Sequence, residues 1–176
     1  MYPVELHGQQ VILREFTGAD LPDVLSIVGD DEVTSWLSFD SRSADEARVM
    51  LDGVLVRARQ EPRAEYYLAV ALPGDSAVLG FARLGLAGTR AAKLGFAVRR
   101  SAWGHGYATD AARTLITFGF GELGLHRIEA GTAVDNVASQ RVLEKNRFTR
   151  VGLLRAHLLI HGEWVDHYLW ERIVGD

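Results

Sequence analysis

The chain has 176 residues, of which 48% are hydrophobic, and this content is enough for the core of one domain spanning residues 1–176. It has no cysteine, which excludes disulfide bonds, thiolate metal sites and a cysteine nucleophile, and we predict no metal site. The formal net charge of −4 argues against a general nucleic-acid-binding protein, because such a protein needs a basic surface.

The amino-terminal residues lack the basic and then apolar pattern of a signal peptide, and no segment is long enough to span a bilayer. We therefore expect a cytoplasmic protein with no membrane partner. A strand is predicted over residues 11–16. A helix follows with apolar residues from Leu21 to Val28 and Asp20 as its N-cap, and a second helix has apolar residues from Ala47 to Ala58 and Ser43 as its cap.

Strands are predicted over 67–72, 78–86 and 91–98, the first two joined by a turn at residues 73–75. A helix then begins near residue 108, and a strand at 127–134, a helix at 137–146 and a hairpin of residues 153–160 and 164–173 complete the chain. The strand–helix–strand order around Gly106 predicts one right-handed parallel crossover. The fold class is therefore α+β, with a mixed, mostly antiparallel sheet of six to seven strands, one parallel βαβ crossover and helices on both faces.

The most informative segment is the turn Gly104-His105-Gly106, which lies between a strand and a helix and follows Arg99 and Arg100. Glycines let main-chain N–H groups point outward, and the start of a helix adds partial positive charge, so this turn is suited to a phosphate or pyrophosphate. A P-loop needs Gly-Lys-Ser/Thr, but Gly106-Tyr107-Ala108 stands here. A dinucleotide-binding turn needs a third glycine where this chain has Thr109.

Three motifs follow one another in the chain: Trp-Gly-x-Gly-Tyr-Ala-Thr from Trp103, Asp-Asn-x-Ala-Ser from Asp135 and Glu-Lys-Asn-x-Phe from Glu144. In this order they resemble the motifs of the GNAT superfamily of acetyl-CoA-dependent N-acetyltransferases. Within it, the chain is similar to the branch of ribosomal-protein N-terminal acetyltransferases of the RimJ/RimL type. The resemblance implies that acetyl-CoA is the acyl donor and that main-chain N–H groups of the glycine turn hold its pyrophosphate. It implies these cofactor-binding residues: Phe96, Val98, Arg99, Arg100, Trp103, Gly104, His105, Gly106, Tyr107, Ala108, Thr109, Asn136 and Ser139.

The resemblance also implies that Ser139 protonates the leaving thiolate, because Leu143 stands where many relatives have a tyrosine for this task. Asn136 would place its amide on the pantetheine arm, although it is also a favoured N-cap for the helix that follows. Lys93 and Leu158 stand where relatives carry a glutamate that acts as general base. His157, beside Leu158, is our candidate for that role, with Glu129, Asp166 and His167 as alternatives.

The acceptor is expected to be a primary amine, either of a small molecule or of a protein N-terminus, with Trp36 and Phe39 lining its cleft because both lie in a predicted loop. A catalytically weak acyl-CoA-binding sensor is the alternative function. The last strand carries large apolar groups on both faces, so one face needs a cover. That cover is either a helix of the same chain or a second subunit in a homodimer.

Overall fold

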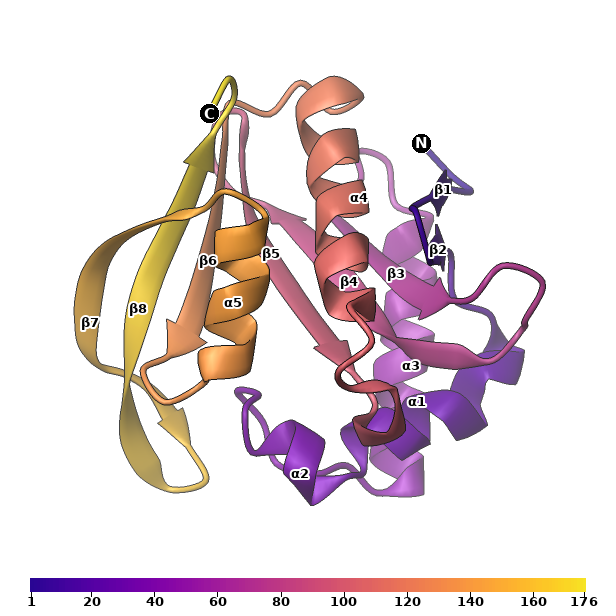
Figure 1. Cartoon of the computed structure of the whole chain (residues 1–176). Helices are drawn as coiled ribbons and strands as arrows, with labels where there is room; N and C mark the ends of the chain where they lie inside the picture. Colours follow the sequence, from indigo (N-terminus) through magenta and orange to yellow (C-terminus); the bar gives the residue numbers. More distant parts are fainter.

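The computed structural model describes all residues, 1–176, and shows one sheet with helices on both faces (Figure 1). The strands are β1 (Glu5–His7), β2 (Ile12–Arg14), β3 (Glu65–Ala71), β4 (Val78–Leu86), β5 (Ala91–Val98), β6 (Arg127–Ala133), β7 (Thr149–Ile160) and β8 (Glu163–Ile173). The helices are α1 (Leu21–Val28), α2 (Asp31–Thr34), α3 (Ala44–Ala58), α4 (Tyr107–Gly121) and α5 (Val137–Lys145). None of these helices is long and apolar enough to cross a membrane.

The eight strands lie in the order β1-β2-β3-β4-β5-β6-β8-β7, and every neighbouring pair is antiparallel except β5 and β6. The predicted α+β fold with one parallel crossover is thus confirmed. The strand beyond the predicted six to seven is β1, whose three residues pair with β2.

Two helical layers enclose two cores. Helices α4 and α5 lie against one face of the sheet, where Leu115 and Leu143 pack with Leu84 and Ile128, all four fully buried. Helices α1 and α3 cover the opposite face over β3 and β4. The opposite face of β6, β8 and β7 carries no helix, as the view in Figure 1 shows. That half of the sheet is therefore open on one side.

Strands β5 and β6 pair over only three residues each, Ala91–Lys93 with Arg127–Glu129. Strand β5 continues to Val98 and β6 to Ala133 without pairing to each other. The carboxyl-terminal half of β5 keeps β4 as its partner, while that of β6 keeps β8. The two strands therefore separate at the end of the sheet from which α4 and α5 begin.

The three predicted N-cap residues, Asp20, Ser43 and Asn136, all stand at helix starts, but only Ser43 and Asn136 make capping bonds with their side chains. Ser43 caps α3, since its Oγ accepts from the Glu46 N–H at 3.3 Å. Asp20 is the N-cap residue of α1 by position, but its side chain makes no capping bond to that helix, because a 3₁₀ turn at Gly18–Asp20, with Thr17 as its own N-cap, runs directly into α1. The buried Asp20 carboxylate instead accepts two hydrogen bonds from Arg14, each at 2.9 Å. The short helix α2 is an element that the sequence patterns do not predict.

Candidate functional site

The free edge of β5 is the first part of the site. The Arg99 N–H donates to the Leu79 carbonyl of β4 at 2.7 Å, so residues one position away direct their main-chain groups to the other side. Phe96 and Val98 therefore face β6, yet pairing with β6 ends at Lys93. Their N–H groups are thus available to an extended ligand lying between the separated strands.

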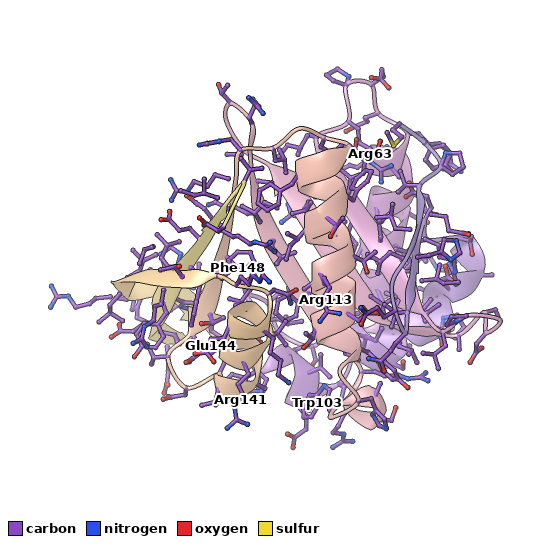
Figure 2. The ribbon with its side chains drawn as sticks, turned by 45° about the horizontal axis from the view of Figure 1, so that its top comes forward. Arg63, Trp103, Arg113, Arg141, Glu144 and Phe148 are labelled. Atoms are coloured by element: carbon purple, nitrogen blue, oxygen red, sulfur yellow. The ribbon has the colours of Figure 1, made fainter.

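The loop after β5 is held by Trp103, whose indole N–H donates to the Val98 carbonyl at 2.7 Å. Figure 2 shows Trp103 at the N-terminal end of α4, while Arg141 and Glu144 project from α5. Although its N–H is occupied, the Trp103 ring is 44% exposed. The indole therefore fixes the end of β5 and still presents a ring face beside the glycine turn.

The glycine turn adopts the backbone that its sequence predicts. Gly104 and Gly106 have φ of +80° and +82°, a region that side chains with a Cβ rarely occupy. The six consecutive N–H groups from Gly104 to Thr109 have no acceptor within the chain, and the first helical bond of α4 runs from the Asp110 N–H to the Gly106 carbonyl at 3.0 Å. Such an array at a helix start is suited to an anion.

The charged and aromatic side chains around the glycine turn differ in burial and in the groups that they contact. The Arg99 Nε is buried without a partner, while Arg100 is exposed and lies 3.5 Å from Asp30, the residue before α2. His105 stacks on Tyr107 with their ring centroids 5.3 Å apart. These residues surround the turn, and their contacts to a cofactor stay a prediction.

Asp110, which the sequence analysis missed, connects α4 to the amino-terminal strands. Its buried carboxylate accepts from the Gln10 N–H at 2.7 Å and from the Val11 N–H at 3.1 Å. The Gln10 side chain in turn reaches 3.4 Å from the position of a Cβ on Gly106. An aspartate in the first turn of a helix was the available signal, and only the fold shows which distant N–H groups it binds.

The start of α5 forms the other wall. Asn136 is its N-cap, with Oδ1 accepting from the Ser139 N–H at 3.1 Å. The half-buried Ser139 hydroxyl makes no hydrogen bond within the chain, so it is free to meet a ligand. Gln140, also missed, donates to the Val134 carbonyl at 2.8 Å and fixes α5 to the end of β6. Leu143, in the position of the relatives' tyrosine, is fully buried.

Asn146 joins the two helices of the site. Its side-chain N–H groups donate to the Thr109 carbonyl in the first turn of α4, at 3.1 Å, and to the Val142 carbonyl, at 2.9 Å. The residue is buried. The asparagine of the third sequence motif thus sets the position of the anion site relative to α5.

Two histidines lie together on the face of the sheet opposite α5. His157, in an irregular stretch of β7, is exposed, and its ring meets that of His167 edge-on, with centroids 5.5 Å apart. His167 is only 5% exposed, and burial is the largest cause that lowers its pKa. Of the other candidates for the base, Glu129 is paired with Arg127 at 2.6 Å, and Asp166 accepts from the Ala156 N–H at 2.7 Å.

The predicted acceptor residues follow α2. Trp36 is 44% exposed, whereas Phe39 packs against the core between α1 and α3 and lies under the Arg42 guanidinium, 4.7 Å from ring centroid to Cζ. The tip of the β7–β8 hairpin reaches this loop through His161, whose Nε2 lies 3.1 Å from the Thr34 carbonyl oxygen. The structure therefore brings the α2 loop to the hairpin and leaves Trp36, more than Phe39, open to a ligand.

Comparison with known proteins decides the family. A family model described as an acetyltransferase (GNAT) domain matches residues 10–149. The chain belongs to the GNAT family. It is an N-acetyltransferase, and enzymes of this family take their acyl group from an acyl-CoA.

Individual relatives are similar over different lengths. The probable N-acetyltransferase YjcK of Bacillus subtilis (strain 168) is 35% identical over 112 residues, so the match spans 62% of this chain and 62% of YjcK. RimJ of Mycobacterium smegmatis in complex with CoA-disulfide has a TM-score of 0.87 at 24% identity, covering 98% of this chain and 88% of that chain. Spermidine N-acetyltransferase of Vibrio cholerae, with CoA and spermine, has a TM-score of 0.80 at 20% identity, covering 93% and 95%. These two solved structures show a shared fold.

Proposed function

We propose that this GNAT enzyme transfers the acetyl group of acetyl-CoA to a primary amine by direct attack within a ternary complex. The observation that carries the proposal is the row of six unpaired N–H groups from Gly104 to Thr109, continuous with the unpaired edge of β5. The first fits a pyrophosphate and the second an extended pantetheine arm. Direct transfer is favoured because the chain has no cysteine to carry the acetyl group.

Bound acetyl-CoA supplies a thioester, whose carbonyl carbon is open to attack by an amine. We expect the N–H groups of Phe96 and Val98 to donate to the carbonyl oxygen as it gains negative charge, because both lie beyond the paired part of β5. As the C–N bond forms and the C–S bond breaks, the amine nitrogen loses one proton and the sulfur gains one. The Ser139 hydroxyl is our candidate to protonate the sulfur, since it has no partner within the chain.

The acceptor we propose is a protein or peptide N-terminus, or a small amine. Support comes from the range of similar proteins, which includes RimJ- and RimL-type ribosomal-protein acetyltransferases and a spermidine N-acetyltransferase. An α-amine has an ordinary pKa of about 8, so part of it is already neutral near pH 7. This makes N-terminal peptides the first acceptors to test.

Mass spectrometry of amines incubated with the protein and acetyl-CoA tests the proposal. The amines are N-terminal peptides, spermidine and other small amines. A product heavier by one acetyl group, formed faster than without enzyme, is the expected result and names the acceptor class. Acetyl-CoA binding without turnover above hydrolysis would overturn the proposal and favour the acyl-CoA sensor.

A further inference from the structure

In the half of the sheet that has no helix on one face, the His167 ring has one nitrogen without a hydrogen-bond partner, while its other nitrogen holds the ring in place. His167 Nδ1 lies 3.2 Å from the Val165 carbonyl oxygen, which can only accept, so Nδ1 carries the proton and Nε2 carries the lone pair. Nε2 makes no hydrogen bond within the chain, although it is not sealed from solvent. When the ring is neutral, the free lone pair of Nε2 therefore has a fixed direction.

The strand register shows which face the ring occupies. His167 is opposite Ala133 at the end of β6, whereas the neighbouring pair, Thr132 and Tyr168, faces α5. The His167 Cδ2 lies 4.0 Å from the position of a Cβ on Gly131, so the ring extends along β6 toward the point where β5 and β6 part. The absence of a side chain on Gly131 leaves this path open.

The acyl donor and the acceptor amine must reach the gap between β5 and β6 from opposite faces of the sheet. Helices α4 and α5, with the anion site and Ser139, occupy one face, so the acyl donor enters from that side. The acceptor amine must then approach from the face without helices (Figure 1), and the strand register places His167 on that face.

We propose that His167 is the general base of the reaction, a role that rests on the proposed function. Its Nε2 takes the proton that the amine nitrogen loses as the C–N bond forms, and later releases it to solvent. The carboxylates used by relatives are replaced by Lys93 and Leu158 in this chain, and Glu129 is neutralised by Arg127. His167 is thus the titratable group on this face that is buried, neutral and unpaired.

The groups that face His167 favour the neutral form. Burial lowers its pKa most, and the charge of His157 on β7 lowers it further, while the bond to Val165 and the charge of Asp166 act in the opposite direction. Its pKa therefore lies below the ordinary value of about 6.5. The ring stays unprotonated near pH 7, as a base must.

The matched variants are His167→Asn and His126→Asn, the second at an exposed histidine just before β6. An asparagine amide at position 167 can still donate to the Val165 carbonyl, where Nδ1 does now, but has no atom at the place of Nε2. With the amine that the library experiment finds fastest, we expect His167→Asn to lower kcat at pH 7 by about 100-fold or more, the usual range for a general base. Acetyl-CoA affinity by calorimetry should stay unchanged, and His126→Asn should lose less than about threefold.

The pH profile separates a base from a structural residue. The wild-type kcat should fall as pH drops below the His167 pKa, whereas the rate of His167→Asn should rise about tenfold per pH unit until the amine itself is deprotonated. A loss below about threefold in folded His167→Asn, or an unchanged pH profile, overturns the assignment of His167. A wild-type enzyme that acetylates no amine overturns the proposed function instead, so the two failures are distinguishable.

Discussion

At the residue scale, the anion site depends on main-chain geometry more than on side chains. Gly106 has φ of +82° and is the N-cap of α4, so its conformation directs the N–H groups of the turn outward. Gly74, in the β3–β4 turn, has a similar φ of +77°, and a Cβ added there would meet no atom within 4 Å. The two glycines carry the same backbone requirement, but only one of them lies at the site.

We predict that Gly106→Val abolishes acetyl-CoA binding, while Gly74→Val leaves it intact. Both changes place a β-branched residue at a positive φ and should cost similar stability, of the order of 1–3 kcal/mol. Only the first also disturbs the N–H groups that would hold the pyrophosphate. Calorimetric titration with acetyl-CoA, after circular dichroism shows both variants folded, measures this. Equal affinity in the two variants would remove the argument for an anion site.

Ser139 allows a second test at this scale, because its N–H serves the helix cap while its hydroxyl is free. We expect Ser139→Ala to lower kcat by about 10²–10⁴-fold with little change in the KM for acetyl-CoA, since proton donation matters only as thiolate forms. Ser139→Thr keeps a hydroxyl and serves as the control. Steady-state kinetics decide the matter, and a loss below about threefold would mean that water or another acid protonates the sulfur.

At the element scale, the turn that ends α5 makes its characteristic hydrogen bonds, although one of its residues has an unfavourable backbone conformation. The Phe148 N–H donates to the Leu143 carbonyl at 3.0 Å and the Arg147 N–H to the Glu144 carbonyl at 2.9 Å, the two bonds of a Schellman motif. Arg147 has φ of +61° in this motif, a position at which glycine is usual. The helix is therefore terminated correctly, with an arginine held in the left-handed region.

We predict that Arg147→Gly stabilises the protein by about 1 kcal/mol, because glycine adopts a positive φ without the steric penalty of a residue with a Cβ. Arg147→Ala keeps the strain and removes the charge, so it should not stabilise. Urea unfolding of both variants measures the effect. A gain in stability for alanine as large as that for glycine would contradict the backbone explanation.

The contact between the β7–β8 hairpin and the α2 loop is the second feature at this scale. His161 Nε2 faces the Thr34 carbonyl and Nδ1 faces the Asp40 carboxylate, so both nitrogens meet acceptors. We predict that His161→Ala releases the loop and raises the KM for the amine acceptor without changing that for acetyl-CoA. Hydrogen exchange should become faster at residues 31–40, but not in His126→Ala, which alters an exposed histidine elsewhere. Unchanged exchange would show that the contact does not hold the loop.

At the scale of the whole molecule, the edge of the sheet at β7 and β8 exposes apolar side chains. Leu153, Leu159 and Trp164 are 51%, 53% and 65% exposed, and the register places them on the face that carries α5. No helix of the same chain covers these three side chains. Trp170, by contrast, is buried and donates to Thr132 at 2.9 Å.

We predict that a second subunit covers this surface. Light scattering at micromolar concentration should give about twice the chain mass of 19.4 kDa. Trp164→Lys should restore the monomer mass, while Val49→Lys, which changes an exposed apolar residue of α3, should not. A wild-type mass near 19.4 kDa throughout would rule out a stable homodimer.

Local signals allow much of this molecule to be predicted. The glycine turn, the Ser43 cap and the Asn136 cap depend on neighbours within about four residues, and each has the geometry that its sequence indicates. The prediction of Asp20 as the cap of α1 holds for its position but not for its side chain, whose carboxylate accepts from Arg14 and from the Thr17 N–H once the chain is folded.

What the sequence determined by itself is the order of the longer elements, the parallel crossover and the turn that suits a pyrophosphate, because these follow from periodicity and from glycine. Only the tertiary structure decided that β5 and β6 part after three residue pairs, and that His167 is buried with a free Nε2 while His157 is exposed. Burial and hydrogen-bond partners depend on residues far apart in the chain. No local sequence pattern therefore distinguishes His157 from His167, ten positions later, as the candidate base. Only the register of β6, β7 and β8 distinguishes them.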